Sequence, residues 1–171
     1  MSGKLLVVVD MQNDFISGTL ASAEAMKILP SVCNRIAEAR KSGETVVFTR
    51  DTHDSNYLQT QEGKRLPVVH CTRDTHGWQI ADGLYEEGDL VFDKGAFGSE
   101  RLAEFVRGGG FSEAELIGVC TDICVISNAL LIKAFCPETE VSVRADCCAG
   151  VTPQSHLTAL SAMRACQVTI L

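Results

Sequence analysis

The sequence has few of the features that suit a nucleic acid as partner. It contains 15 Lys and Arg residues against 22 Asp and Glu residues, which gives a formal net charge of −7. Binding to a nucleic-acid backbone depends on clustered basic side chains that release counterions. This charge balance argues against a nucleic acid, and small molecules become the expected partners.

Long hydrophobic runs are also missing. The first apolar run, Leu5–Val9, ends directly at Asp10, whereas a membrane helix needs about 20 apolar residues in succession. The run is likewise too short for the hydrophobic core of a signal peptide. We therefore expect no membrane insertion and a cytoplasmic location.

The eight cysteines include no CxxC pair, which argues against a thioredoxin-type site or a zinc knuckle. In a chain of this size without an export signal, the cysteines are expected to be free thiols, most of them small buried hydrophobic side chains. A thiol redox sensor that uses the Cys147–Cys148 pair is a weak alternative, because adjacent cysteines rarely form an unstrained disulfide. Cys120 with Cys124 is the other pair that such a sensor would use.

Short apolar runs alternate with segments that carry helix signals. Runs that are apolar throughout are typical of strands buried on both faces of a parallel sheet. The expected strands are Leu5–Val9, Thr45–Thr49, Leu90–Phe92, Glu115–Val119, Val141–Val143 and Val168–Leu171. Strands that alternate with helices predict a three-layer α/β/α fold, and the chain length suits a single domain spanning residues 1–171.

Helix boundaries are marked by capping residues, proline and glycine. A first helix is predicted to begin at Pro30 and to end at Gly43, since proline is tolerated at the first helical position and glycine closes helices in the left-handed conformation. Further helices are predicted to begin after Ser99, Thr121 and Thr152. By contrast, residues 51–89 are polar and weakly periodic, and a loop of that length in a compact domain is usually functional.

Three reactive residues lie just beyond the expected strand ends: Asp10, Lys94 and Cys124. Parallel strands bring their carboxyl ends to one edge of the sheet, where ligands bind, so these residues are expected to converge. Cys124 would lie in the first turn of a helix, where the dipole favours a thiolate. Each residue alone has a simpler interpretation, as a buried helix cysteine, a capping aspartate or a solvated lysine.

Three segments, Val7–Phe15, Lys94–Phe97 and Gly118–Val125, resemble the isochorismatase-like cysteine hydrolases, a superfamily that includes nicotinamidases. The resemblance runs from the first strand to the last. It implies a Rossmann-like six-stranded parallel sheet in the order 3-2-1-4-5-6. It also implies a catalytic triad of Asp10, Lys94 and Cys124.

The resemblance further implies a cis peptide bond between Val119 and Cys120, and an oxyanion hole formed by the backbone N–H groups of Cys120 and Cys124. Isochorismatase itself lacks the nucleophilic cysteine. Cys124 therefore favours hydrolysis of a C–N bond in an amide, with Asp10 as the base and Lys94 keeping the thiolate available near neutral pH.

The polar segment 51–89 carries candidate metal ligands. Asp51, His53 and His70 offer one carboxylate and two imidazoles, which suit zinc, iron or manganese. The pattern resembles the nicotinamidase metal site, in which Asp-x-His is followed by another carboxylate or His and then by a final His. Glu62 would fill the third place. The alternative is hydrogen-bonded loop histidines beside a solvated Glu62.

With a metal bound, most simply zinc, the resemblance implies that the metal binds a pyridine nitrogen of the substrate and places the carboxamide near Cys124. Gln12, Asn13 and Phe15 follow the first strand directly and are expected to shape that pocket. Phe15 suits stacking on an aromatic ring, and a core position equally. The remaining histidines, expected to be surface residues, are His76 and His156.

The expected function is cysteine-dependent hydrolysis of a small-molecule carboxamide through a thioester, with nicotinamide as the best candidate. Two alternatives stay open. One is a metal-free amidase of an N-carbamoyl or ureido compound, and the other is a noncatalytic, ligand-binding member of the fold. Because the family usually forms dimers or larger assemblies, a homo-oligomer is also implied.

Overall fold

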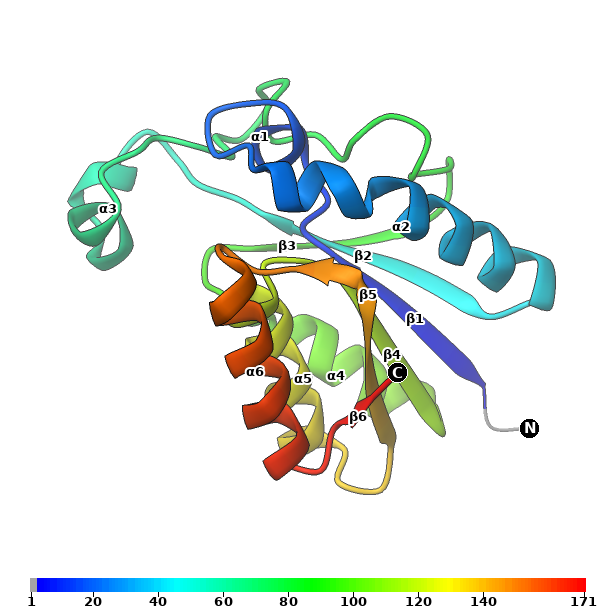
Figure 1. The fold of residues 1–171 in the computed structure, drawn as a ribbon. Helices are drawn as coiled ribbons and strands as arrows, with labels where there is room; N and C mark the ends of the chain where they lie inside the picture. Colours follow the sequence, from blue (N-terminus) through cyan, green and yellow to red (C-terminus); the bar gives the residue numbers. More distant parts are fainter. Residues whose placement is uncertain (1–2) are drawn as a thin grey trace.

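Six parallel strands form one sheet in the order β3-β2-β1-β4-β5-β6 (Figure 1), which confirms the expected topology. The structure is a computed structural model and describes residues 3–171. Met1 and Ser2, with which the expected domain 1–171 begins, lie outside the described residues. The strands are β1 (Lys4–Val9), β2 (Thr45–Asp51), β3 (Leu90–Lys94), β4 (Glu113–Val119), β5 (Glu140–Ala149) and β6 (Thr169–Ile170).

Helices cover both faces of the sheet, so the three-layer α/β/α arrangement is also confirmed. Figure 1 shows α2 on one face and α4, α5 and α6 on the other. The α-helices are α1 (Asn13–Ile16), α2 (Ala23–Ser42), α3 (Gln61–Arg65), α4 (Glu100–Gly109), α5 (Ile126–Phe135) and α6 (Pro153–Ala165). Two short turns complete the elements, the 3-10 turn η1 (Tyr57–Gln59) and the π-helical turn η2 (Thr121–Val125).

The central strand β1 shows why the apolar runs become buried strands. Successive side chains of a strand point to opposite faces of the sheet. Leu5, Val7 and Val9 pack in one hydrophobic cluster with residues of α4, α5 and α6. Leu6 and Val8 pack in the other cluster, with residues of α2. A strand that must be apolar on both faces loses the alternating pattern, as the sequence of β1 does.

Two expected helix starts are wrong. Helix α2 begins at Ala23 rather than at Pro30, which lies inside the helix. The Ser22 side chain caps this earlier start by accepting a hydrogen bond from Ala25 N at 3.0 Å. Burial of the α2 face before Pro30 outweighs the backbone hydrogen bond that a proline cannot donate. The predicted end at Gly43, with φ of 75°, is confirmed.

The second wrong start is Thr121, because Cys120 occupies the N-cap of η2 and has no side-chain cap hydrogen bond. The Thr121 hydroxyl lies 2.8 Å from Nδ1 of His156 instead. His156 is therefore partly buried against η2 rather than a free surface residue, whereas His76 is exposed as expected. The predicted caps of α4 and α6 are confirmed, because Ser99 accepts from Leu102 N and Thr152 from Ser155 N.

Strand β5 is longer than predicted, and its register against β4 shifts between Leu116 and Gly118. Gly118 has φ of 115°, and a Cβ atom at this position would lie 2.1 Å from the backbone oxygen of Val9. Only glycine permits this close approach of β4 to β1. The irregularity lies directly before the turn that carries Cys124.

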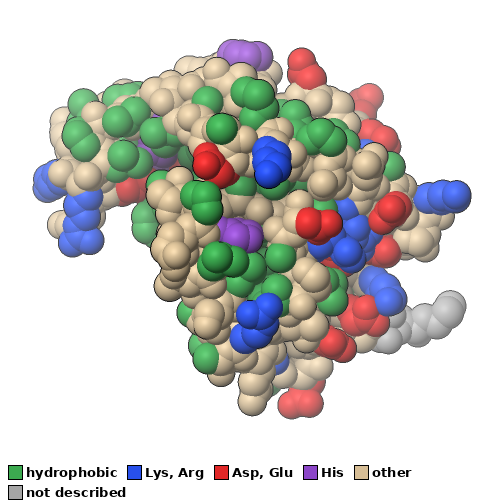
Figure 2. Space-filling model, in the orientation of Figure 1, with side chains coloured by type: hydrophobic (Ala, Val, Ile, Leu, Met, Phe, Trp, Pro, Cys, Tyr) green, Lys and Arg blue, Asp and Glu red, His purple; other side chains and the backbone are tan. Residues whose placement is uncertain are grey.

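The polar segment after β2 contains η1 and α3, which stand away from the body of the molecule (Figure 1). Exposed apolar side chains gather over this projection (Figure 2), and they include Leu58, Leu66 and Val69. Within residues 3–171, no helix combines the length and apolar character that a membrane span requires.

Candidate active site and metal site

Asp10, Lys94 and Cys124 meet at the carboxyl edge of the sheet. Asp10 follows β1, Lys94 ends β3, and Cys124 lies in η2 after β4. Lys94 Nζ lies 2.7 Å from Asp10 Oδ2 and 3.5 Å from Cys124 Sγ. The three residues are 0%, 4% and 7% exposed, in that order. The structure thus brings together all three members of the expected triad.

Asp10 is held in an unusual backbone conformation, with φ of 49°. Thr49 of the adjacent strand β2 fixes its carboxylate, because Thr49 Oγ1 donates to Asp10 Oδ1 at 2.7 Å. Asp10 Oδ2 has the Lys94 ammonium as its ion-pair partner and makes no hydrogen bond. Burial raises the pKa of Asp10, Lys94 opposes this effect, and the nearby charge of Asp51 adds to it. A more basic carboxylate is a better proton acceptor.

Lys94 remains an ammonium despite its burial. Burial alone would lower the pKa of Lys94, but the neighbouring carboxylates, Asp10 before Asp51, outweigh that effect and raise the pKa. Lys94 also contacts Asp51, whose Oδ1 lies 3.4 Å from Nζ. The single ammonium therefore joins the triad to the neighbouring carboxylate of the candidate metal site.

The surroundings of Cys124 act on the pKa of its thiol in opposite directions. Burial raises the pKa of the Cys124 thiol well above its ordinary value, and the charge of Asp10 raises it further. Lys94 acts in the opposite direction without overcoming these two effects. From the sequence, only the helix dipole and the lysine were expected to act on the thiol. In the folded chain, burial and the adjacent carboxylate act against both, so removal of the thiol proton depends on a base close by, and Asp10 is in place for that.

The peptide bond between Val119 and Cys120 is cis, as the resemblance implied. Cys120 then begins the tight turn η2, in which both Ile123 N and Val125 N donate to Cys120 O at 3.0 Å. This turn places the Cys124 side chain toward Lys94. The oxyanion-hole role of the backbone N–H groups of Cys120 and Cys124 stays a prediction.

The four expected metal ligands lie together beside the triad. One ligand atom from each residue falls within 4.8 Å of all the others, and the residues of this group are Asp51, His53, Glu62 and His70. Asp51 comes from the end of β2, Glu62 from α3 and His70 from the loop after α3. Nε2 of His70 lies 3.5 Å from Asp51 Oδ2 and 3.8 Å from Glu62 Oε1.

The orientation of these side chains fits a shared cation. His53 Nε2 is buried and lies 2.8 Å from Asp51 Oδ2, yet the pair lacks the geometry of a hydrogen bond. A buried nitrogen without a hydrogen bond is costly unless another partner satisfies it. His70 Nδ1 lies 2.7 Å from Val68 O, a contact that fixes the ring and turns Nε2 toward the centre. Nitrogen and carboxylate donors in this number suit zinc, iron or manganese.

The pKa values of the two carboxylates in this group are shifted in opposite directions. Burial alone would raise the pKa of Asp51, but His53, His70 and Lys94 outweigh it and lower the pKa. Burial raises the pKa of Glu62, and the charge of Asp51 adds to this effect. Two like charges that face one centre repel each other, and a cation between them would stabilise both ionised carboxylates.

The predicted pocket residues are tied to the backbone. Gln12 is fully buried, and its Nε2 donates to Asp51 O at 2.9 Å and to Trp78 O at 2.8 Å. Asn13 Nδ2 donates to His76 O. Phe15 packs edge-on against the ring of His70, with centroids 5.9 Å apart. Gln12 thus braces the end of β2 that carries Asp51, and contact of these residues with a substrate stays a prediction.

The sequence-based prediction missed several residues that support the site. Thr49 fixes Asp10, and its signal was a polar residue in an apolar strand. Trp78 donates from Nε1 to Thr52 Oγ1 at 2.8 Å, and the Arg50 guanidinium lies 3.3 Å from the centroid of the Trp78 ring. Asn128 donates to the backbone oxygen of Cys124 at 2.8 Å. A polar residue within the apolar helix α5 was the available signal for Asn128.

Comparison with known proteins connects this chain to one family. The Isochorismatase domain family matches residues 4–171. A protein of Arabidopsis thaliana described as a probable inactive nicotinamidase is 31% identical over 88% of this chain and 83% of its own length. Nicotinamidases of yeasts and bacteria also match, at 25–29% identity.

Solved structures agree with this family over nearly the whole fold. The zinc complex of Pyrococcus horikoshii pyrazinamidase has a TM-score of 0.87 and 30% identity, and the match covers 98% of each chain. The N-carbamoylsarcosine amidase of Thermoplasma acidophilum has a TM-score of 0.83 and 30% identity, over 98% of this chain and 95% of that one. With the sheet order, the triad geometry and the family match taken together, the chain belongs to the isochorismatase family.

Proposed function

We propose that this chain is a cysteine-dependent amidohydrolase that cleaves the C–N bond of a small linear carboxamide, with nicotinamide as the first candidate substrate. The observation that carries the proposal is the contact of Lys94 Nζ with both Asp10 Oδ2 and Cys124 Sγ, at 2.7 and 3.5 Å. A nucleophile, a base and a fixed cation within reach of one another form the minimum set for acyl transfer. The nicotinamidases and amidases among the relatives support the same chemistry.

The first half of the proposed reaction forms a thioester. Asp10 takes the proton of the Cys124 thiol while Sγ attacks the carbonyl carbon of the amide. Lys94 stays charged and offsets the negative charge that passes between thiol and carboxylate. The backbone N–H groups of Cys120 and Cys124 are proposed to hold the oxyanion, and each such donor contributes about 3 kcal/mol in comparable sites.

The second half releases the acid. Asp10 gives its proton to the leaving amine, which departs as ammonia and leaves the acyl group on Cys124 Sγ. Water then loses a proton to Asp10 and attacks the thioester carbonyl. The carboxylic acid departs, and the proton returns from Asp10 to the thiol. One carboxylate thus serves as base and acid in turn, a role that its raised pKa supports.

A divalent metal, with zinc as the first choice, is proposed to be held by Asp51, His53, Glu62 and His70. When bound, it would supply a Lewis acid for a ring nitrogen or a water molecule beside the reacting carbonyl. The chain's own contribution is to fix the ligand set, through Gln12 on Asp51 and through Val68 on His70. The zinc-bound pyrazinamidase supports this proposal.

A second candidate is an amidase that acts on an N-carbamoyl compound, because N-carbamoylsarcosine amidase is as similar in sequence as the pyrazinamidase. Ammonia release from nicotinamide and from N-carbamoylsarcosine, measured beside the metal content, separates the two. Faster release from nicotinamide with about one bound metal per chain supports the first proposal. Faster release from the carbamoyl compound, unchanged by a chelator, supports the second.

A noncatalytic, ligand-binding role is the third possibility, and the relative described as probably inactive keeps it open. The triad contacts argue against it, because a binding protein has no need for a thiol held between an ammonium and a carboxylate. Absence of hydrolysis of every amide tested, together with slow and equal alkylation of all eight cysteines, would establish the binding role.

The assembly and location expected from the sequence also stay predictions. Light scattering during size-exclusion chromatography measures whether the chain forms the implied homo-oligomer. Limited proteolysis tests whether residues 1–171 behave as one domain. Fractionation of cells that express the chain tests the cytoplasmic location.

A further inference from the structure

Asn128 makes three hydrogen bonds inside an otherwise apolar part of α5. Its side chain is 1% exposed. Oδ1 accepts from Ser99 N at 2.9 Å, and Nδ2 donates to Cys124 O at 2.8 Å and to Phe97 O at 3.1 Å. Both N–H groups of the amide and its oxygen are thereby used. A buried amide that is fully satisfied holds its partners in one fixed arrangement.

The partners of Asn128 belong to the two segments that carry the nucleophile and its cation. Cys124 lies one helical turn before Asn128. Phe97 and Ser99 lie in the short loop that follows Lys94 and leads into α4. The loop lies directly on α5, because a Cβ atom on Gly98 would be 3.4 Å from Leu131 Cδ2 and 3.6 Å from Ser127 O.

Strand pairing does not fix the distance between Lys94 and Cys124. Strand β3, which ends at Lys94, is separated in the sheet from β4 by β2 and β1. The turn with Cys124 follows β4, so the two side chains reach each other only across the edge of the sheet. Contacts between their segments help to hold them together, and Asn128 makes hydrogen bonds to both segments.

We propose that Asn128 is a positioning residue that ties the loop after Lys94 to the turn of Cys124 and so sets the approach of ammonium and thiol. This inference rests on the proposed cysteine mechanism. Asn128 does not touch the reacting atoms, and it acts only through the backbone of its partners. A misplacement of about 1 Å in a catalytic group can cost about 100-fold in rate.

Two substitutions of Asn128 remove different hydrogen bonds of the bridge. Asn128→Asp keeps an acceptor for Ser99 N but cannot donate to either carbonyl. Asn128→Ser keeps a hydroxyl that can donate to Cys124 O four residues back, as serine does in helices, but it is too short to reach Phe97. Ile132→Ala is the matched control, because Ile132 is fully buried one turn further along α5 and removing its side chain weakens packing without touching the bridge.

The first readout is the rate of Cys124 alkylation by iodoacetamide at one fixed pH, followed by peptide mass spectrometry. This rate requires no substrate, so it tests the bridge even if the chain hydrolyses no amide. We expect the alkylation rate of Cys124 in both Asn128 variants to differ from the parent rate by at least about tenfold. The rate in Ile132→Ala should stay within about twofold of the parent. Unchanged alkylation in a folded Asn128→Ser protein overturns the proposal.

The second readout uses ammonia release from the best amide substrate. We expect kcat to fall about 10- to 100-fold in both Asn128 variants with KM within about threefold, and bound metal to stay equal to that of the parent. The Asn128 variants could instead lose stability as Ile132→Ala does, without a selective fall in kcat. That result would show that Asn128 is only structural. Loss of turnover in the parent chain itself would instead contradict the proposed function.

Discussion

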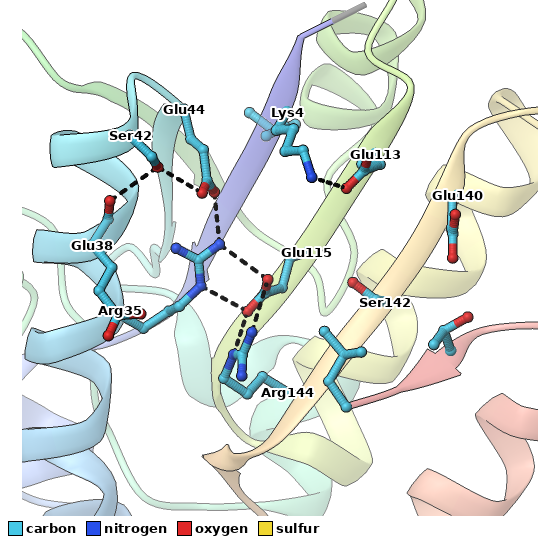
Figure 3. A pocket seen from close by; sticks show the side chains of 13 residues that line it. Lys4, Arg35, Glu38, Ser42, Glu44, Glu113, Glu115, Glu140, Ser142 and Arg144 are labelled. Atoms are coloured by element: carbon cyan, nitrogen blue, oxygen red, sulfur yellow. Dashed lines mark hydrogen bonds and ion pairs between the residues drawn. The ribbon is translucent and has the colours of Figure 1, made fainter.

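Charged side chains pair with one another toward both ends of the sheet, and the two groups have opposite proportions of positive and negative charge. At the carboxyl end, the single ammonium of Lys94 faces two carboxylates and a thiol. Toward the amino end, Glu115 lies between two guanidinium groups, those of Arg35 and Arg144 (Figure 3). We call the second group, Arg35, Glu44, Glu115 and Arg144, the amino-end network. Figure 2 shows red and blue side chains gathered together on this side of the molecule.

Folding shifts the pKa values of the carboxylates in the two groups in opposite directions. Burial alone would raise the pKa of Glu115, but Arg35 and Arg144 outweigh it and lower the pKa. The pKa of Asp10 is raised, because one shared ammonium does not compensate for complete burial and a second carboxylate. A fully paired carboxylate stabilises the fold and resists protonation. An incompletely paired carboxylate takes up protons, which is what the proposed reaction requires.

The largest difference between the two groups is expected at Cys124, where a substitution should remove activity and leave stability almost unchanged. We expect Cys124→Ala to abolish ammonia release, with a loss on the order of 10⁴-fold or more, because no other group can form the thioester. The small alanine fills the same place in η2, so the thermal unfolding temperature should change little. Ammonia release by the purified variant at more than about 1% of the parent rate would contradict the mechanism.

A smaller effect is expected for the metal site. His53→Ala removes the buried nitrogen that faces Asp51, so we expect loss of bound metal. The decrease in metal affinity should be at least about 100-fold, since even an outer partner of a metal ligand contributes about 10- to 100-fold. Elemental analysis of the purified protein measures this, and His76→Ala, which changes an exposed histidine, is the control. Equal metal content in His53→Ala and the parent would refute the site.

The amino-end network is predicted to affect stability and not activity. Glu115→Gln leaves Arg35 and Arg144 without their shared, partly buried carboxylate, and loss of a hydrogen bond to a charged group typically costs about 1.5–3 kcal/mol. We expect that decrease in the free energy of unfolding in urea, with kcat within about twofold of the parent. Glu113→Gln is the matched control, because the pair of Glu113 with Lys4 is exposed and is expected to contribute less than about 1 kcal/mol.

The smallest predicted effect is on the pH dependence of stability. Because folding lowers the pKa of Glu115 below its ordinary value of 4.5, the stabilisation by Glu115 is complete above that value and is lost as the pH falls through the lowered pKa. The difference in unfolding free energy between the parent and Glu115→Gln should therefore be constant from about pH 6 to 8 and decrease below about pH 4. A difference that grows on acidification has the wrong sign.

The sequence predicted features that depend on local pattern and on strand ends. The six strands and the convergence of Asp10 with Lys94 and Cys124 follow from apolar runs and from the geometry of parallel sheets. The order of the strands was implied only by the resemblance to the isochorismatase-like hydrolases. The start of α2 was missed because burial of Ala25 and Ile28 is decided by the sheet beneath them. Pro30 alone carried no information about that packing.

The sequence also did not predict the effect of burial on the pKa of Cys124 or the bridging contacts of Asn128. The first depends on how far burial outweighs the Lys94 charge, which is set by side chains from three separate strands. The second depends on a loop and a helix about 30 residues apart in the chain. Contacts between residues so far apart in the chain leave no periodic pattern in the sequence. Both features could therefore be found only in the folded structure.

Cys124 is the proposed nucleophile, and a comparison of activity with alkylation of Cys124 tests this role directly. Samples taken during slow inactivation by iodoacetamide are divided between an ammonia-release assay and peptide mass spectrometry. If Cys124 is the nucleophile, the remaining activity equals the fraction of unmodified Cys124 at every time point. Alkylation of the exposed Cys166 should not change this relation. Activity that persists after Cys124 is fully alkylated, or that disappears while Cys124 remains unmodified, would contradict it.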